Sequence, residues 1–597
     1  MRHEVRKTVS VVFSDVAGST ALAERLDPEP LRRVMTRYFE VARAVHERHG
    51  GVVEKFIGDA VMAVFGVPCA HEDDALRAVR AAWELRPAIA GLNQELEREL
   101  EVGLCVRTGV NTGLVLAGDG RDQQAFVGGD TVNVAARLEQ AAGPGEVLVG
   151  AATLELVADA VRVRPVDGFS VRGRSVSAAA YRLLDLTPAA AGLARRMDLP
   201  LVGRAAELDL LERSLARAVG RRAPELVTVL GDPGMGKTRL LRAFGDRVAG
   251  RAVVLRGRCP AYGPEPAGQL AGQLVAQAEA AGAAAPVGAG APGPLAPGLP
   301  PASGRLRSLL QDLAAARPVV VAVDDLHWAG QPTWDLVDYL HRFAGGSPLL
   351  LVVTARRQFL DRAPDWTAGA ATTTLVLPPL PAGAAAELAA GPFGPGAVDA
   401  AVAARVAALA EGNPLLTEEL LRHAANGDGR VAGIPGQLEE PAFPPAVEAL
   451  VAAELDRLPP EERRVLELAS VVGRVFDGAS VAALAADRLR PLVGTTLLAL
   501  ARRNLIRMAG QEPGRDGFAF RNGVLRELTY RTLPKRHRAV LHVQVAERLD
   551  GAARDGSHDE TIGRHLGQAY RHLAELATDE PPPTAPAVGR RAAHGPR

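Results

Sequence analysis

Apolar positions along the chain follow two spacings, one typical of strands and one typical of helices. Short apolar runs, each the length of one strand, lie at 9–13, 52–57, 60–65, 226–230, 318–323 and 349–354. Apolar residues recur every three or four positions at 31–45, 71–83 and 131–140, which predicts amphipathic helices. With further strands at 103–110 and 114–117, the first 185 residues have the order strand, helix, strand, strand, helix, strand.

That order is the ferredoxin-like α+β pattern with further elements after it, and it assigns residues 1–185 to a first domain. After a linker at 186–197, buried-type strands and helices from 198 to 375 predict a domain with a parallel sheet. Residues 376–440 are Ala- and Leu-rich with a helical period, and 441–580 predict a mostly helical region. An Ala-, Gly- and Pro-rich insertion at 278–304 and a tail at 581–597 are expected to be disordered. The chain is therefore an α/β multidomain protein.

Composition changes this picture little. Of 597 residues, 69 are Lys or Arg and 69 are Asp or Glu, so no net charge favours nucleic acid or an acidic membrane. Three cysteines, Cys69, Cys105 and Cys259, lie far apart without His at ligand spacing, which indicates a reducing compartment. No signal peptide opens the chain and no apolar run is long enough to span a bilayer. We expect a cytoplasmic protein.

Two carboxylates follow predicted strands in the first domain. Asp15 ends the first strand, and Asp59 lies at the tip of the hairpin formed by 52–57 and 60–65. Carboxylates from distant strands can converge on a pair of divalent cations, and Mg²⁺ prefers oxygen ligands shared with phosphates. Residues 17–20 after Asp15 open a helix. They suit either an anion at the helix start or an ordinary strand–turn–helix with a capping residue.

Five motifs in the first domain resemble the class III nucleotidyl cyclase catalytic domain, and they occur in the family order. They are FSDVAGST at 13–20, KFIGDAVMAVFG at 55–66, PCAHEDDALRAVRAA at 68–82, VRTGVNTG at 106–113 and VGGDTVNVAARLEQA at 127–141. The resemblance implies that Asp15, Asp59 and the Val16 carbonyl hold two Mg²⁺ or Mn²⁺ ions. It also implies that ATP is the substrate and that the product is cyclic AMP.

The same resemblance assigns the remaining residues of this site. Asn133 orients the ribose, and Arg137 stabilises charge on the transferring phosphorus, a role that suits a permanent planar cation. Arg107 contacts the polyphosphate, and Arg172 stands where the family usually has a lysine. The two halves of the site come from different catalytic domains, so activity implies a homodimer.

The residues that choose the base depart from the family pattern. Lys55 matches the lysine that specifies adenine, but the second specifying position is Phe126, which cannot hydrogen-bond to the base. Either Lys55 and backbone groups recognise adenine, or specificity is relaxed. Neither position supplies a glutamate for guanine, so ATP is favoured over GTP.

A second nucleotide site lies in residues 198–375. The strand at 226–230 runs into GDPGMGKT and then a helix, the full context of a Walker A loop. Its glycines Gly231, Gly234 and Gly236 let backbone N–H groups wrap the phosphates, while Lys237 reaches the β- and γ-phosphates. Thr238 and Asp324 are expected to hold Mg²⁺, and Asp325 to orient the attacking water.

The rest of the chain resembles AAA-like and STAND-type ATPases. Arg204 belongs to an opening that packs near the adenine in that family. Arg356 and Arg357 follow the strand at 349–354 and allow two interpretations: one of them senses the γ-phosphate, or both are surface charges. Residues 411–420 resemble the GNP lid helix, and the segment from Pro444 resembles a winged-helix region. The basic run 535–538 suits a solvated helix face better than nucleic acid, because it lacks interleaved aromatics.

These observations lead to one functional expectation and one alternative. The expectation is an adenylate cyclase regulated by the fused ATP-binding domain in response to an unknown protein or small-molecule signal. The alternative is a STAND ATPase switch, connected with signalling or transcription, whose cyclase domain binds nucleotide without catalysis. The filled positions Asp15, Asp59, Asn133 and Arg137 favour the first.

Overall fold

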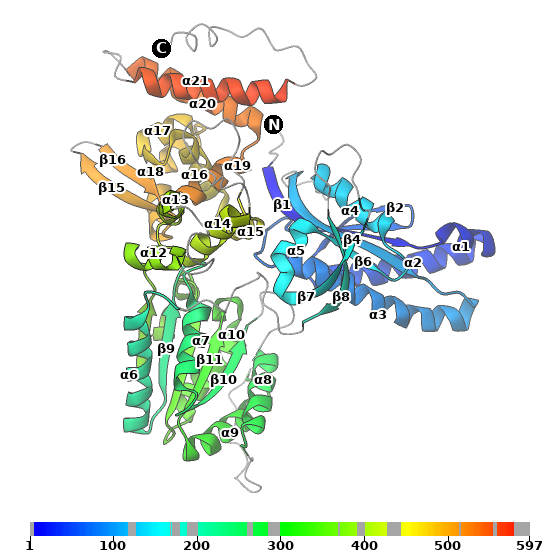
Figure 1. Cartoon of the computed structure of the whole chain (residues 1–597), viewed down its shortest axis with the longest axis horizontal. Coiled ribbons are helices and arrows are strands. Elements are labelled where there is room, and N and C mark those ends of the chain that lie inside the picture. Colours follow the sequence, from blue (N-terminus) through cyan, green and yellow to red (C-terminus); the bar gives the residue numbers. More distant parts are fainter. Residues whose placement is uncertain are drawn as a thin grey trace. The chain divides into compact units, whose positions relative to one another are not determined.

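The computed structural model describes most of the chain in two compact units. The described residues are 5–117, 127–167, 169, 179–187, 201–259, 267–283, 299–367, 371–390, 400–426, 443–512, 515–552 and 558–577. One unit combines residues 1–195 with 443–597, and the other comprises 196–442 (Figure 1). Residues 427–442 and the predicted tail at 581–597 lie outside the described residues. In the part of the chain that is described, no helix is both long and apolar enough to cross a bilayer.

A mixed sheet forms the first domain. Its strands are β1 (Val5–Val16), β2 (Val52–Ile57), β3 (Ala60–Phe65), β4 (Val106–Ala117), β5 (Val127–Gly128), β6 (Val147–Gly150), β7 (Val161–Val166) and β8 (Ala180–Leu186). They are ordered β2-β3-β1-β4-β6-β8-β7, with β5 paired to β4. The helices are α1 (Ser19–Arg25), α2 (Pro28–Arg48), α3 (Asp74–Leu100), α4 (Asp130–Ala141) and α5 (Ala151–Val157). Because β1 lies between β3 and β4, its second half is buried without a break from Val9 to Val16.

Helix α4 packs directly on the sheet. Val11 and Phe13 of β1 share a core with Met62 of β3 and Ala135 of α4. Gly109 of β4 permits the close approach, since a Cβ there would lie 2.3 Å from the backbone nitrogen of Glu139. Gly109 thus allows the buried face of α4 to lie directly on β4, the strand next to β1.

Two predicted elements of this domain differ from the structure. The strands expected at 103–110 and 114–117 form one strand, β4, because Gly113 continues the ladder opposite Val9. The helix expected at 71–83 extends as α3 to Leu100, since buried Leu85, Ile89, Leu92 and Leu96 continue its period. The hairpin of β2 and β3, with Gly58 and Asp59 at its tip, forms as predicted.

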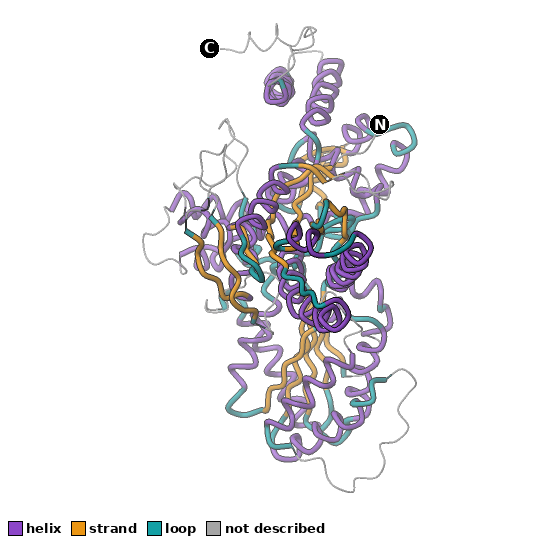
Figure 2. The backbone as a smooth tube through the Cα atoms, turned by 90° about the vertical axis from the view of Figure 1, so that its right-hand side faces the viewer, coloured by secondary structure: helices purple, strands orange, loops and turns teal. Residues whose placement is uncertain are grey.

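The second unit contains a five-stranded parallel sheet. Its strands are β9 (Glu225–Leu230), β10 (Val253–Arg258), β11 (Val319–Asp324), β12 (Leu349–Ala355) and β13 (Thr372–Val376), ordered β10-β11-β12-β9-β13. The helices are α6 (Ala205–Arg221), α7 (Lys237–Val248), α8 (Ala267–Ala280), α9 (Ser303–Ala316), α10 (Gln331–Phe343) and α11 (Phe359–Arg362). Figure 2 shows purple helices on both sides of these orange strands.

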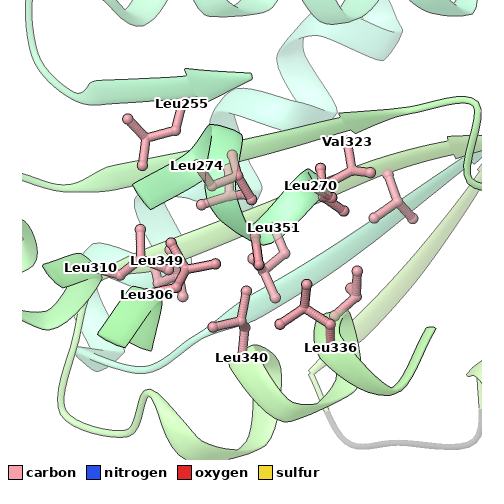
Figure 3. Packing of buried hydrophobic residues seen from close by; sticks show 14 of the residues in the cluster. Leu255, Leu270, Leu274, Leu306, Leu310, Val323, Leu336, Leu340, Leu349 and Leu351 are labelled. Carbon is pink, nitrogen blue, oxygen red and sulfur yellow. The ribbon is translucent and has the colours of Figure 1, made fainter. Parts of the chain in front are cut away.

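Alternate residues of the central strands enter two different cores. Val323 and Leu351 face the core that also contains Leu270 of α8, Leu306 of α9 and Leu340 of α10 (Figure 3). Val320, Leu350 and Val352 face the other core, together with Leu240 and Phe244 of α7 and Leu211 of α6. Both faces of the sheet are therefore covered, which explains the continuous apolar runs in the sequence.

The structure corrects two details of this unit. Both ends of the insertion expected to be disordered at 278–304 are helical, because Ala278 is buried in α8 and Ser303 begins α9; residues 284–298 lie outside the described residues. The edge strand β13 was not predicted. Its Thr-rich sequence lacks an apolar run and none of its side chains is fully buried.

Helices complete both units. The expected lid contains α12 (Ala382–Ala390), α13 (Ala400–Ala410) and α14 (Pro414–Asn426). The C-terminal region contains α15 (Pro445–Leu455), α16 (Pro460–Val472), β14 (Val475–Asp477), α17 (Gly478–Leu484), α18 (Val493–Arg502), β15 (Ile506–Glu512), β16 (Arg515–Phe520), α19 (Gly523–Thr532), α20 (Lys535–Ala552) and α21 (Asp559–Leu576). Helices followed by a small sheet, β14-β16-β15, agree with the winged-helix-like expectation.

The basic run 535–538 is engaged within the protein. Arg538 is fully buried, donates to the carbonyls of Leu533 and Arg531 and lies over the Tyr530 ring. Lys535 pairs with Glu575 at 2.7 Å. The solvated helix face expected for this run is therefore wrong for Arg538, whose buried guanidinium helps to hold α20 in place.

Candidate functional site

The two predicted metal carboxylates lie together at one end of β1. Ser14 is paired with Val61, so Asp15 comes level with the start of β3, directly after Asp59. Asp15 is only 8% exposed. Burial raises the pKa of Asp15, the Arg107 guanidinium lowers it, and hydrogen bonding with the Asp59 carboxylate raises it again. Side chains 44 positions apart in sequence are thus within interaction distance of each other.

Neighbouring residues hold this end of the strand. Tyr38 of α2 is buried and donates to the Ser14 carbonyl at 3.1 Å. Gly18 has a φ of 76°, a left-handed conformation that favours glycine, and it turns the chain into α1. Gly18 is itself the N-cap of α1 and has no side chain to cap it, so the segment is a strand–turn–helix that starts on a glycine.

Arg107, which the family resemblance assigns to the polyphosphate, lies beside Asp15. This position follows from the pairing of β1 with β4, which places Arg107 opposite Asp15. Its Nε and Nη2 donate to Asp15 Oδ2 at 3.1 and 2.6 Å. Its Nε also lies 2.7 Å from Oε1 of Glu139, a residue of α4 that is 5% exposed. Burial raises the pKa of Glu139 to about 7.

Sequence reasoning missed Glu139. The motif containing Asn133 and Arg137 drew attention to one face of α4, whereas Glu139 lies on the buried face. The sequence did contain one signal for Glu139: its carboxylate falls at a helix position that lies among the buried residues Ala135 and Leu138. An acidic side chain at a core position requires a partner, and the nearest cation is Arg107.

The other predicted cyclase residues reach the surface or cannot be placed. Asn133 is exposed and Arg137 is partly exposed, four residues apart on α4, and Lys55 is exposed on β2. Surface positions are what a site shared between two copies requires, because each copy must present these groups to its partner. Phe126 and Arg172 lie outside the described residues.

The donor set suits Mg²⁺ or Mn²⁺ that is shared with a nucleotide. Asp15 and Asp59 supply hard oxygen donors close together, and the third predicted donor is the carbonyl of Val16, the residue after Asp15 in β1. Among the residues that the structure describes, no three His, Cys, Asp or Glu side chains form a metal-binding group. These donors are too few to fill an octahedral shell, so waters and substrate phosphates would complete it, as is usual for Mg²⁺.

The Walker A loop of the second unit has the expected form. Gly234 and Gly236 have φ values of 80° and 85°, which glycine adopts without strain. Lys237 begins α7, and its Nζ donates to the carbonyls of Gly231 and Asp232 at 2.7 and 3.0 Å. The loop therefore curls around the lysine that is expected to bind phosphate.

The predicted Mg²⁺ ligands of this second site also meet. Thr238 Oγ1 donates to Asp324 Oδ2 at 2.7 Å. The buried Thr354 donates to the other oxygen of Asp324 and accepts the backbone N–H of Asp325 at 2.9 Å. Asp325 Oδ2 accepts two hydrogen bonds from Arg258 at 2.8 and 3.1 Å. Sequence reasoning missed Arg258, whose strand β10 adjoins β11 only in the folded sheet.

The structure separates the three arginines assigned to this site. Arg204 is buried and donates to Glu207 and to the carbonyls of Pro378 and Met235. Arg356 is buried and donates to His327, whereas Arg357 lies 3.7 Å from Asp232 of the Walker A loop. Of the last two, Arg357 is therefore the one beside the phosphate loop.

The GNP segment contacts the Walker A loop. Asn413 donates to the Pro233 carbonyl at 3.0 Å, and the backbone N–H of Leu415 donates to the Gly234 carbonyl at 3.2 Å. Glu418 of α14 pairs with Arg239 of α7. The predicted lid is thus hydrogen-bonded to the loop that would hold the nucleotide.

Comparisons with known proteins agree with this division. Residues 1–184 match the family described as Adenylate and Guanylate cyclase catalytic domain, and residues 200–353 match the AAA ATPase domain. An uncharacterized protein of Rhizobium meliloti (strain 1021) is 26% identical over 581 residues, covering 90% of this chain and 55% of that protein. The chain thus spans about half the length of that relative.

Two further matches cover the first domain. Adenylate cyclase 1 of the same organism is 28% identical over 192 residues, which is 31% of this chain and 28% of that protein. The crystal structure of the adenylyl cyclase CyaB from P. aeruginosa is 32% identical, covering 33% of this chain and all of that one, with a TM-score of 0.29. The chain therefore joins an adenylate and guanylate cyclase catalytic domain to an AAA ATPase domain in one polypeptide.

Proposed function

We propose that the chain is an adenylate cyclase that converts ATP to 3′,5′-cyclic AMP and pyrophosphate. The observation that carries the proposal is the meeting of Asp15 and Asp59 at one end of β1, with Arg107 beside them. Two divalent cations bound there would activate the ribose 3′-oxygen and neutralise the leaving pyrophosphate. This is the chemistry that cyclisation of a nucleoside triphosphate requires.

The chain's own side chains have distinct tasks in this proposal. Asp15, Asp59 and the Val16 carbonyl bind the cations, and Arg107 contacts the polyphosphate, with Arg172 as a further contact. Asn133 holds the ribose in position. Arg137 places a permanent positive charge beside the phosphorus while its bond to pyrophosphate breaks and its bond to the 3′-oxygen forms. Together these groups orient the 3′-oxygen and stabilise charge that develops during the reaction.

The proposal requires a homodimer. Asn133 and Arg137 of α4 and Lys55 of β2 lie at the surface of their own copy, whereas Asp15 is buried at the sheet end. Two copies related by a two-fold axis would bring each set of surface groups to the carboxylates of the partner. Each dimer would contain two equivalent sites.

We assign ATP as the preferred substrate. Lys55 supplies a donor for the adenine edge, and Phe126 offers no carboxylate that would select guanine. The second unit, in turn, would regulate the cyclase according to its own bound ATP. The hydrogen bonds from Asn413 and Leu415 to the Walker A loop support this role, because they connect the start of helix α14 to the expected phosphate site.

The proposal is tested by offering the purified protein Mn²⁺ with ATP or GTP and measuring both cyclic nucleotides. We expect cyclic AMP to dominate. Asp59→Asn, which keeps the size of the side chain, should lower the rate by about 100-fold or more, because it removes a metal ligand. Absence of any cyclic nucleotide from a protein shown to be dimeric would contradict the proposal.

The intact Walker site supports a second candidate, an ATPase switch whose cyclase domain is inactive. Thr238 and Thr354 both donate hydrogen bonds to Asp324, so the expected Mg²⁺ ligands are connected without help from the cyclase domain. Measuring cyclic AMP output separates the candidates. If the chain is a cyclase, Asp59→Asn abolishes output and Lys237→Ala alters only its regulation. If it is a switch, neither variant changes cyclic AMP, and Lys237→Ala alone abolishes function.

A further inference from the structure

Glu139 lies next to the proposed metal site but is neither a metal ligand nor a nucleotide contact in the proposed reaction. Its side chain is buried on α4, and its Oε1 is 2.7 Å from Arg107 Nε. The Nε–H of Arg107 is nevertheless directed at Asp15 Oδ2, 3.1 Å away. As a result Glu139 Oε1 receives no hydrogen bond from any residue that the structure describes.

Two carboxylates therefore compete for one guanidinium. Asp15 accepts hydrogen bonds from both Nε and Nη2 of Arg107, while Oε1 of Glu139 lies against Nε without receiving one. Leaving a buried carboxylate oxygen without a donor costs free energy. A small rotation of the Arg107 side chain would transfer the Nε–H to Glu139 and satisfy that oxygen.

A cation at Asp15 would drive this exchange. Asp15 cannot give the same oxygen to Arg107 and to a divalent cation without bringing two positive charges together. When a cation binds the Asp15 carboxylate, the Arg107 guanidinium must move away from it. Glu139 is an acceptor that Arg107 already contacts. Gly109 keeps the backbone of Glu139 close to β4, so this acceptor stays in reach of the arginine.

We propose that Glu139 is a positioning residue that accepts Arg107 when a divalent cation displaces it from Asp15, and so holds Arg107 ready for the triphosphate. Asp15 and Glu139 are thereby two alternative acceptors for the Arg107 guanidinium, and metal binding at Asp15 shifts the arginine from the first to the second. This inference rests on the proposed function, because it assumes a cation at Asp15. It can still be tested without turnover.

The test measures Mn²⁺ affinity of the full chain without nucleotide, by calorimetry or by the spin-resonance signal of free Mn²⁺. Glu139→Gln should weaken binding by about tenfold, the effect of losing one charge-assisted hydrogen bond in the metal-bound state. Arg107→Gln should strengthen binding, because it removes the competing cation from Asp15. Glu146→Gln is the matched control, since Glu146 pairs with Arg182 and should leave the affinity unchanged.

The double variant decides whether Glu139 acts through Arg107. In the Arg107→Gln background, adding Glu139→Gln should change Mn²⁺ affinity by less than about twofold. An equal weakening in both backgrounds would show that Glu139 attracts the metal directly, and no weakening in either would show that it has no part; both results overturn the inference. If Glu139→Gln unfolds, Glu139→Asp withdraws the carboxylate from Arg107 and should weaken Mn²⁺ binding in the same direction.

Turnover gives an independent readout. Glu139→Gln should raise KM for ATP more than it lowers kcat, because Arg107 binds phosphate that is present before and after the reaction. A fall in kcat at constant KM would contradict the assignment. Because Mn²⁺ binding is measured without ATP, a wild-type protein that makes no cyclic AMP would defeat the proposed function and leave this test standing.

Discussion

Single residues fix the distances in the cyclase site. Gly109 allows α4 to approach β4, and a Cβ at this position would lie 2.3 Å from Glu139 N and 2.4 Å from Ala135 O. Both are backbone atoms, so no side chain can rotate away. Because α4 carries Asn133 and Arg137, the glycine determines where those groups stand relative to the sheet.

Gly109→Ala should therefore push α4 outward. We expect unfolding free energy to fall by about 1–3 kcal/mol, the usual cost of overpacking, together with loss of cyclase activity. Gly91→Ala is the control: Gly91 lies in α3 with open space around it, so alanine should stabilise the helix by about 0.5–1 kcal/mol. Denaturant titration measures both, and equal stability of the two variants would refute the close-packing argument.

Individual residues also show what sequence could and could not predict. The positions of Asp15 and Asp59 followed from strand patterns and motif order, because each carboxylate comes two positions after the end of an apolar run. Glu139 and Arg258 could not be found this way. Each acquires its role from a partner on another element, Arg107 on β4 and Asp325 after β11, and no local spacing records such a contact.

At the scale of elements, the C-terminal helices enclose a chain of buried polar side chains. Tyr530 Oη lies 2.8 Å from His542 Nε2 and 2.6 Å from His572 Nε2, and His542 Nδ1 lies 2.7 Å from His565 Nδ1. Burial, followed by the charges of neighbouring His565 and His572, lowers the pKa of His542 to about 2. Burial and Arg564 lower the pKa of His565 to about 4.

These shifts set the pH dependence of stability for the C-terminal region. Histidine in an unfolded chain has a pKa near 6.5. Below that pH these histidines therefore bind protons in the unfolded chain but remain neutral in the folded chain. The contribution of these histidines to stability is therefore complete above pH 6.5 and falls progressively as the pH decreases toward 4. Denaturant unfolding followed between pH 7.5 and 5.0 measures the slope. His565→Gln should flatten it, and an unchanged slope would refute the role of this cluster.

Elements also differed in how well the sequence predicted them. Strands β9, β11 and β12 are buried on both faces and therefore appear as continuous apolar runs, which are easy to recognise. Strand β13 pairs with β9 at the sheet edge, and its Thr-rich, half-exposed sequence gives no such signal. Pairing with a neighbour, rather than local pattern, makes it a strand.

At the scale of the whole molecule, the first unit unites segments from both ends of the chain. Asp456, 5% exposed at its side chain, accepts hydrogen bonds from Lys7 Nζ at 2.7 Å and from the backbone of Ala70 at 2.8 Å. Arg463 pairs with the other oxygen of the same carboxylate. The sequence placed residues 441–580 after the ATPase and contained no sign of this connection, because it joins positions more than 380 residues apart.

Asp456→Ala should weaken this connection. It leaves Lys7 and the Ala70 N–H without their shared acceptor, and removing one partner of a buried ion pair typically costs about 3 kcal/mol. We expect a lower unfolding midpoint and increased proteolysis around residue 7. Asp487→Ala is the control, since Asp487 is almost fully exposed and pairs only with Arg490 among described residues. Equal effects of the two substitutions would refute a structural role for Asp456.

The most direct test of the account asks whether two copies complete one active site. Asp59→Asn and Arg137→Ala should each be inactive alone, because each dimer then lacks a metal ligand or the phosphorus-stabilising cation in both sites. Mixed in equal amounts, they should recover about a quarter of wild-type cyclic AMP production, since half the dimers are mixed and each has one intact site. A mixture as inactive as its components, in dimers shown to exchange subunits, would contradict the account.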